Sequence, residues 1–276
     1  MKINTIGWAV GFAANDVNTA LGPWYWYYHP ELLSKHIKLQ WQNIIYCSSE
    51  FSGLQVAESL TEALGKLAHS VANNLQERPL LILGGDHTIA MGTWPEIQQK
   101  YANLGLIWVD AHLDSHTPDS SQSKNFHGMS LARLLGVWGG EAVFKPNQVC
   151  VIGARSYESA EYELLQQLGV KIIMMEEIRG KNVQFYLQEA LDYLKISCAH
   201  LGLSIDLDAF DPLDCPGVGC PEQNGIKPQD FFDFFKKTLW RDWVAIEVVE
   251  FNPILDKQQK TAKWLAEFLD SMYNYE

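Results

Sequence analysis

The sequence has 276 residues, of which 47% are hydrophobic and 20% are charged, and its formal net charge is -12. This length is enough for one large α/β domain with a sizeable core. The acidic balance argues against nucleic acids and anionic membranes as general partners, and it would suit a cationic substrate. The five cysteines are odd in number and no pair has C-x-x-C spacing. This favours a reducing compartment, so we expect a cytoplasmic protein.

Apolar runs and helical periodicities alternate along the chain. In chain order they predict a strand at 3–10, a strand at 42–47, a helix at 54–75, a strand at 80–83, a helix at 88–101, a strand at 104–109, a helix at 129–135, a strand at 148–153, a helix at 158–168, a strand at 170–174, a helix at 183–194, a strand at 199–205, a helix at 228–239, a strand at 243–249 and a helix at 257–272. Most connections are long enough for right-handed crossovers between parallel strands. The sequence therefore predicts a single three-layer α/β domain over residues 1–276, with a mostly parallel sheet of about eight strands flanked by helices.

Two segments near the N-terminus have more than one interpretation. The mildly apolar start up to Ala14 faintly resembles a signal peptide, but its polar residues favour a first strand and loop. Residues 22–30 are dense in aromatic side chains, and we expect a helix start packed on the domain edge rather than a subunit contact. No apolar run approaches the length of a membrane span.

A cluster of acidic and imidazole side chains follows the apolar run at 104–109. If extended geometry continues past Val109, then Asp110, His112 and Asp114 alternate onto one face. Open α/β sheets bind their ligands at the carboxyl ends of strands. Because carboxylates so close together repel one another unless a cation neutralises them, the cluster predicts a divalent metal site.

Two other predicted strands end in the same chemistry. His87 follows two glycines after the strand at 80–83, and Asp206 and Asp208 follow the strand at 199–205. Four carboxylates and two imidazoles are too many for one ion with open coordination positions, and they suit two ions bridged by shared carboxylates. Mixed Asp and His ligation without thiolate points to Mn²⁺, Fe²⁺, Co²⁺ or Zn²⁺, and the carboxylate-rich balance favours Mn²⁺.

Two further residues complete a candidate hydrolytic site. A pair of metal ions brings the pKa of a shared water toward neutrality and makes hydroxide available as a nucleophile. Glu250 leaves the last predicted strand and could bind a cationic electrophile. His127 lies in the loop after the acidic cluster, and its titration range suits proton transfer to a leaving amine.

Three motifs together resemble the signatures of the ureohydrolases, the family of arginase, agmatinase and formimidoylglutamase. They are Gly84-Gly-Asp-His87, Asp110-Ala-His-Leu-Asp114 and Ser204-Ile-Asp-Leu-Asp-Ala-Phe-Asp-Pro212, and their order and spacings match. The resemblance implies a dimanganese hydrolase with a single-domain α/β fold over almost the whole chain. It also implies a homo-oligomer, a trimer or a hexamer.

The resemblance implies a role for each ligand. His87, Asp110, Asp114 and Asp206 would hold one manganese ion, while His112, Asp208 and the bridging pair Asp110 and Asp206 would hold the second. Asp114 would also steady the tetrahedral intermediate. His127 would move the proton, and Glu250 would pair with the substrate guanidinium.

The stretch from His116 to His127 looks most like arginase, because its length and its Thr-Pro pair are the same. Ser123 and Asn125 fall where arginases hold the α-carboxylate of arginine, and Glu161 falls on an acidic position. The chain departs from arginases at four positions on the substrate side. They are His116 in place of Asn, Lys124 in place of Gly, Glu158 in place of Asp and Cys220 in place of Thr.

We therefore expect a small cationic guanidino substrate, most simply an amino acid, and neither nucleic acid nor membrane as a partner. The leading hypothesis is hydrolysis of L-arginine to ornithine and urea through a metal-bridging hydroxide. Another guanidino acid, formiminoglutamate and agmatine are alternative substrates. A deacetylase of the same fold with one zinc ion, and a metal-stabilised sensor or assembly subunit without activity, are further hypotheses.

Overall fold

The computed structural model describes residues 1–14, 16–47, 54–75 and 79–273. Its centre is an eight-stranded sheet with the order β2-β1-β3-β8-β7-β4-β5-β6, in which all neighbouring strands are parallel. The strands are β1 (Lys2–Ala9), β2 (Lys38–Tyr46), β3 (Leu80–Leu83), β4 (Leu104–Val109), β5 (Val149–Ala154), β6 (Lys171–Met174), β7 (His200–Asp206) and β8 (Trp243–Val249). The predicted parallel α/β sheet is confirmed.

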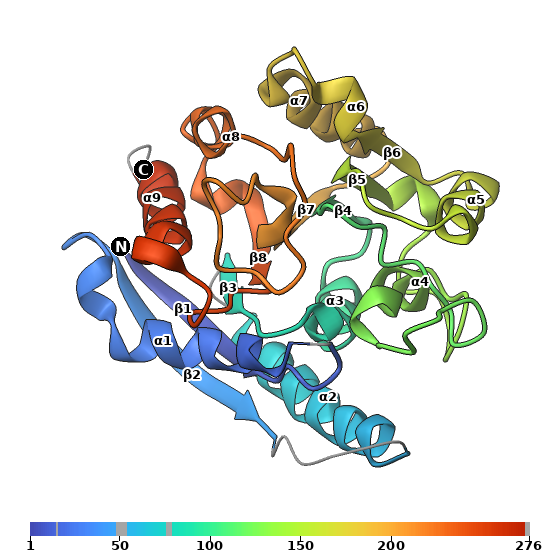
Figure 1. Cartoon of the computed structure of the whole chain (residues 1–276), viewed down its shortest axis with the longest axis horizontal. Helices are drawn as coiled ribbons and strands as arrows, with labels where there is room; N and C mark the ends of the chain where they lie inside the picture. Colours follow the sequence, from blue (N-terminus) through green and yellow to red (C-terminus); the bar gives the residue numbers. More distant parts are fainter. Residues whose placement is uncertain (15, 48–53, 76–78, 274–276) are drawn as a thin grey trace.

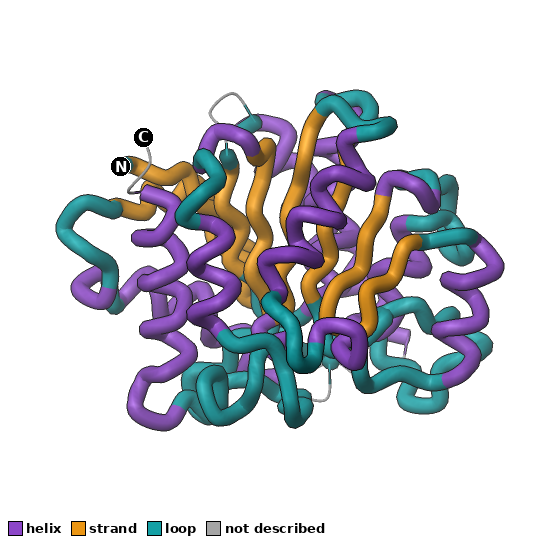
Figure 2. Tube along the Cα trace, turned by 90° about the horizontal axis from the view of Figure 1, so that it is seen from above, coloured by secondary structure: helices purple, strands orange, loops and turns teal. Residues whose placement is uncertain are grey.

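Helices cover both faces of this sheet (Figures 1 and 2). They are α1 (Gly22–Tyr28), α2 (Leu54–Asn74), α3 (Ala90–Lys100), α4 (Ser130–Leu134), α5 (Ser159–Leu168), α6 (Met175–Ile178), α7 (Val183–Lys195), α8 (Pro228–Phe235) and α9 (Lys260–Tyr273). The buried side chains of α2 to α5 join one hydrophobic core, and those of α1 and α6 to α9 join the other. The result is the predicted arrangement of three layers. Within the described residues, no helix has the length and apolar character that crossing a membrane requires.

The central strands are buried on both faces, which explains their continuous apolar sequences. Every residue of β3, β4, β5 and β8 is buried, as expected for parallel strands between two helical layers. The edge strand β2 instead consists of half-buried and exposed residues, apart from the buried Ile45. The interior strands therefore differ from the edge strand in being buried on both faces.

Several predicted boundaries were wrong by a few residues. Strand β2 begins at Lys38 rather than at residue 42, because its pairing with β1 already starts between Lys2 and Lys38. Helix α8 ends at Phe235, whose carbonyl accepts a hydrogen bond from the Thr238 hydroxyl at 3.0 Å, rather than at residue 239. Helix α9 begins at Lys260 rather than at residue 257, because Asp256 accepts hydrogen bonds from the first backbone amides of this helix.

The strand order brings the predicted site to one place. Strands β3, β8, β7 and β4 are neighbours in the middle of the sheet, although they are far apart in the sequence. Their carboxyl ends lead to His87, Glu250, Asp208 and Asp110 respectively. Since parallel strands end at the same edge, these side chains meet in one region.

Candidate metal centre

The loop after β3 is shaped by a close approach of two backbones. A Cβ on Gly85 would lie 2.0 Å from the carbonyl oxygen of Val10, so only glycine fits here. The Asp86 carboxylate then accepts hydrogen bonds from the amides of Ala13 and Thr88 at 3.1 and 3.2 Å. These contacts fix the short 3-10 turn His87–Ile89 and present the buried His87 ring at the edge of the sheet.

The loop after β4 holds the acidic cluster in a bent conformation. Asp110 accepts hydrogen bonds from the Trp108 indole at 2.9 Å and from the His112 amide at 2.7 Å. Asp114 has a left-handed backbone, with φ of 44°. The expected extended geometry is therefore wrong beyond Val109, and the three side chains converge because the chain turns.

The third loop folds back toward the second. Asp206 is the last residue of β7, and its carboxylate accepts a hydrogen bond from the Asp208 amide at 2.9 Å. Asp208 in turn accepts one from the Ala111 amide at 3.2 Å. This last bond joins the loop after β7 to the loop after β4.

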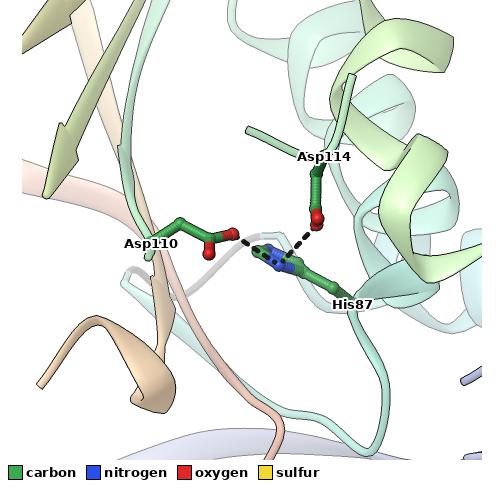
Figure 3. Close-up of side chains that lie close together, drawn as sticks. All are labelled: His87, Asp110 and Asp114. Carbon is green, nitrogen blue, oxygen red and sulfur yellow. Dashed lines mark ion pairs between the residues drawn. The ribbon is translucent and has the colours of Figure 1, made fainter. Parts of the chain in front are cut away.

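The first candidate ion site surrounds the His87 Nδ1 atom. This atom lies 3.1 Å from Asp114, 3.3 Å from Asp110 and 3.3 Å from Asp206, measured to one carboxylate oxygen of each. Figure 3 shows the Asp110 and Asp114 carboxylates pointing toward the ring. Although Nδ1 is buried among these oxygens, it makes no hydrogen bond of acceptable geometry within the described residues. Three carboxylates around one imidazole nitrogen fit the ligand set of a divalent cation.

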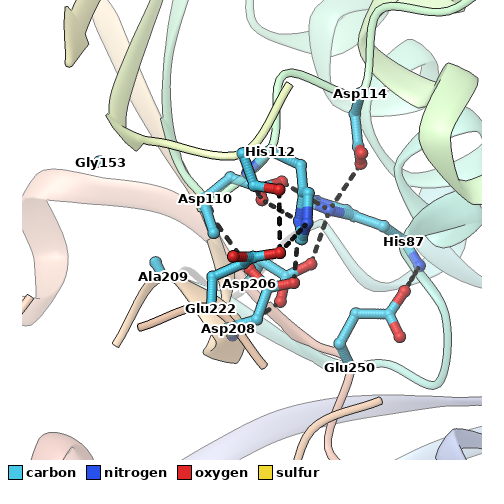
Figure 4. Close-up of polar contacts among 12 residues, drawn as sticks. His87, Asp110, His112, Asp114, Gly153, Asp206, Asp208, Ala209, Glu222 and Glu250 are labelled. Carbon is cyan, nitrogen blue, oxygen red and sulfur yellow. Dashed lines mark hydrogen bonds and ion pairs between the residues drawn. The ribbon is translucent and has the colours of Figure 1, made fainter. Parts of the chain in front are cut away.

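The second candidate ion site shares Asp110 with the first. His112 Nδ1 lies 3.0 Å from Asp208 and 3.6 Å from the second oxygen of Asp110. Figure 4 shows how the carboxylates of Asp110, Asp206 and Asp208 gather beside the two imidazoles. Five of the six predicted ligands therefore form two overlapping groups that share Asp110, and the sixth, Asp206, lies beside His87. The shared carboxylate suits a pair of neighbouring ions.

The electrostatics of the cluster call for positive charge. Burial, together with the nearby charge of Asp110, raises the pKa of Asp114 to about 6. Burial and the charges of Asp208 and Asp110 raise the pKa of Asp206 well above its usual value. Burial alone would lower the pKa of His87, but the surrounding carboxylates outweigh it and raise that pKa. The buried carboxylates repel one another, and a bound divalent cation would compensate their negative charge.

Glu250 and His127 adjoin the first ion site. One Glu250 oxygen accepts a hydrogen bond from the His87 amide at 2.9 Å and lies 3.3 Å from His127 Nδ1. Burial opposes the charging of His127, but Glu250 outweighs it and raises the pKa of His127 to about 9. Glu250 has a left-handed backbone, with φ of 65°, and its amide donates to the Gly85 carbonyl at 2.7 Å. A non-glycine residue held in this conformation is typical of functional sites.

Comparison with known proteins assigns the chain to a family. A sequence model of the Arginase family matches residues 14–274. The chain belongs to the arginase family. Arginase of Bacillus subtilis strain 168 is 40% identical over 219 residues, which cover 75% of this chain and 73% of that protein. Arginase of Bacillus caldovelox is 36% identical over 232 residues, covering 80% and 78%. A crystal structure of Bacillus subtilis arginase superimposes with a TM-score of 0.89 at 34% identity, and covers 100% of this chain and 99% of that one.

In this member of the arginase family, a cavity of about 290 Å³ opens from the metal centre. Its inner end is lined by metal-ligand candidates together with His127 and Glu250. Its outer end is lined by the predicted substrate residues His116, Ser123, Glu158, Glu161 and Cys220. Grooves of about 460 and 520 Å³ lie elsewhere and contain none of the predicted site residues, so we assign the site to the smaller cavity.

The outer residues differ in how freely they can bind a substrate. Glu161 is buried and accepts hydrogen bonds from the amides of Ser115 and Glu158 at 3.1 and 3.0 Å, so it organises the start of α5. The Glu158 side chain is 50% exposed, and its carboxylate lies 3.7 Å from His116 Nε2. Asn125 is not among the residues that line the cavity, and its backbone N–H donates to the Ser123 hydroxyl at 3.3 Å.

His116 is held by protein contacts on both ring nitrogens. Its Nδ1 lies 3.1 Å from the Ser120 hydroxyl and its Nε2 lies 3.3 Å from Glu161. Because both nitrogens are already engaged, His116 shapes the cavity wall. Burial raises the pKa of the Cys220 thiol to about 12, so this wall residue stays uncharged.

Sequence reasoning overlooked Ser156 and Tyr157, which also line the cavity. Both follow β5, the strand beside β4. The signal was therefore present, because the rule that directed attention to the ends of the other strands applies equally to this one. It was missed because neither residue is a metal ligand or a titratable group at neutral pH.

Proposed function

We propose that this protein hydrolyses the guanidino group of L-arginine to ornithine and urea, with two Mn²⁺ ions per chain. The observation that carries the proposal is the pair of ligand groups sharing Asp110, at the inner end of a cavity that also contains Glu250. Similarity to proteins named arginase over most of the chain supports the choice of substrate. We further propose that residues 1–276 act as one catalytic domain.

The donor set supports manganese. Carboxylate oxygens and imidazole nitrogens surround both sites, and no cysteine lies among the candidate ligands. Such oxygen-rich mixed ligation suits Mn²⁺ better than it suits a thiophilic ion. When bound, a pair of such ions would lower the pKa of a water molecule and so supply a nucleophile near neutral pH.

The chain's own residues would orient the substrate and move its proton. One Glu250 oxygen is engaged by the His87 amide, which leaves the other to receive a guanidinium N–H. His127 lies close enough to Glu250 to be held in place, and its raised pKa keeps it protonated near neutral pH. A protonated imidazole at the inner end of the cavity can donate its proton to the leaving amine. As the family resemblance implies, Asp114 would also steady the tetrahedral intermediate.

The outer end of the cavity supports an amino-acid substrate. Glu158 is the carboxylate available to an α-ammonium group, while the Ser123 hydroxyl could donate to an α-carboxylate. Asn125 would join this clamp only if its side chain turned toward the cavity. His116, Glu161 and Cys220 would set the shape of this end rather than the charge recognition.

The cellular setting is also a proposal. All five cysteines are free, which supports a reducing compartment such as the cytoplasm. A homo-oligomer, a trimer or a hexamer, stays a prediction from the family resemblance. Light scattering on a size-exclusion column would test it, and a monomer at micromolar concentration would contradict it.

The decisive experiment is a substrate panel. The protein is loaded with Mn²⁺ and given arginine, agmatine, guanidinobutyrate and formiminoglutamate separately, with urea or formamide measured as product. We expect urea from arginine to dominate. Urea from agmatine but not from arginine would reject the amino-acid clamp. A stoichiometry of one zinc ion per chain, with release of acetate from acetylated amines, would instead favour the deacetylase hypothesis.

A further inference from the structure

Arg155 lies beside the metal centre in the loop after β5, and its side chain is bound to backbone carbonyls. The guanidinium donates to six carbonyl oxygens at 2.7–3.5 Å, those of Gly153, Asp208, Ala209, Phe210, Glu222 and Gln223. A guanidinium has five N–H donors in a planar fork, so these contacts use its full donor capacity. Among the described residues, it forms no ion pair with a carboxylate. Arg155 is therefore committed to the backbone.

The carbonyl partners belong to loops that are distant in the sequence. The shortest contact, 2.7 Å, is with the Asp208 carbonyl, and the next, 2.8 Å, is with the Glu222 carbonyl. The Arg155 amide itself donates to the Ala111 carbonyl at 2.8 Å. One residue thus joins the loop after β4, the loop after β7 and the segment that contains Glu222.

These loops carry one half of the metal centre. The Asp208 carboxylate lies 3.0 Å from His112 Nδ1, and the position of its backbone determines where that carboxylate stands. Glu222 lies 3.8 Å from the other ring nitrogen of His112 and accepts a hydrogen bond from the Ser156 hydroxyl at 2.9 Å. Figure 4 shows Glu222 and Asp208 on the same side of His112. Arg155 therefore holds the backbone of the two acidic residues that lie next to the ring nitrogens of His112.

The other half of the metal centre is held by different contacts. His87 is fixed by the turn after β3 and by Ser204, whose hydroxyl lies 3.0 Å from its Nε2. The Asp114 carbonyl accepts hydrogen bonds from α4. None of the Arg155 hydrogen bonds reaches these residues. A change at Arg155 should therefore affect the two ion sites unequally.

We infer that Arg155 is a positioning residue for the ion site formed by His112 and Asp208, and not for the site formed by His87 and Asp114. The inference rests on the proposed two-ion centre. Groups that hold metal ligands in place typically contribute about 10–100-fold to metal affinity when they are lost. Since a lysine ammonium has three donors from a single nitrogen, Arg155→Lys keeps the charge but cannot bridge the same loops.

The experiment compares wild-type protein with Arg155→Lys and with the control Arg133→Lys. Arg133 also donates to a backbone carbonyl, that of Glu141 at 3.3 Å, but on the outer side of α4. Each metal-free protein is titrated with Mn²⁺ by calorimetry, and bound manganese is followed by electron paramagnetic resonance. We expect wild type and Arg133→Lys to bind two ions and to give the spectrum of an exchange-coupled pair. Arg155→Lys should bind the first ion normally and the second at least about 10-fold more weakly, with the spectrum of an isolated ion at intermediate manganese concentrations.

The outcomes separate this inference from the proposed function. Equal weakening of both ions in Arg155→Lys, or no weakening of either, would overturn the selective role. A wild-type protein that binds two ions but does not hydrolyse arginine would reject the proposed function and leave the role of Arg155 supported by the titration. A wild-type protein that binds a single ion would overturn both. If Arg155→Lys does not fold, Ser156→Ala provides a second test of the same half of the centre. It removes the hydrogen bond that holds the Glu222 carboxylate beside His112, so it should weaken the same ion alone, and equal or absent weakening would overturn the selective role.

Discussion

Gly85→Ala should disturb both the fold and the metal centre, because the structure leaves no room for a side chain at this position. The added Cβ would lie 2.0 Å from the carbonyl oxygen and 2.9 Å from the carbonyl carbon of Val10, and 3.0 Å from the Trp8 carbonyl oxygen. All three are backbone atoms, so no side-chain rotation can relieve the overlap. The loop after β3 must move away from β1.

The cost of this movement follows from what Gly85 holds together. Its amide donates to the Trp8 carbonyl at 2.6 Å and its carbonyl accepts from the Glu250 amide at 2.7 Å. We expect a loss of unfolding free energy of about 3 kcal/mol, at the upper end for overpacking of a buried site. For a chain of this length, about 3 kcal/mol corresponds to a fall in Tm of roughly 5 °C.

The assay is thermal unfolding of the metal-free proteins, followed by Mn²⁺ titration of the folded ones. Gly65→Ala is the matched control, since its Cβ would meet no atom within 4 Å on the exposed face of α2. The control should gain about 0.5–1 kcal/mol from helix propensity. If Gly85→Ala unfolds at the temperature of the control and binds manganese equally well, the argument from backbone contact is refuted.

Three further outcomes are expected. Removing the ions with a chelator should lower Tm. When the free ion concentration is 100 times the Kd of a site, the binding free energy lost is about 2.7 kcal/mol, and an unchanged Tm would contradict a metal site in the folded protein. Glu250→Gln retains the oxygen that accepts from the His87 amide but loses the charge facing the guanidinium, so kcat/KM for arginine should fall at least about 30-fold, while a fall below about 3-fold would reject the pairing. Asn182→Ala removes the side chain that caps α7 at the Gln184 amide, 2.9 Å away, and should cost about 1 kcal/mol without changing manganese binding.

The interior of the sheet was predictable because strands such as β3, β4 and β5 are apolar throughout. Burial on both faces leaves no alternation to confuse with a helix, and the interior strands end where the polar loops begin. Helix ends were less predictable. Helix α9 begins after a carboxylate cap at Asp256, and the short α6 (Met175–Ile178) was not predicted at all, because four residues carry too little periodicity.

The candidate site was predictable to the extent that its residues directly follow strands. Asp110 and Asp206 come within one residue of a strand end, and their convergence needs only parallel neighbours. The left-handed backbone of Asp114 and Glu250 could not be read from the sequence, since it depends on contacts with other loops. Arg155 was missed for the same reason, because its partners are carbonyl groups and a carbonyl is present in every residue.

The position of β8 explains why one edge of the sheet can hold both the ions and the substrate. The chain forms β3 and β4 in succession, yet β7 and β8 lie between them in the sheet. This insertion places Glu250 between the loop that carries His87 and the loop that carries Asp206. If β8 lay at the edge of the sheet instead, the ligands of β3, β4 and β7 could still meet, but no carboxylate from a fourth strand would stand beside His87. The position of β8 between β3 and β7 therefore places a carboxylate beside the ion site, where it can bind the cationic group of a substrate.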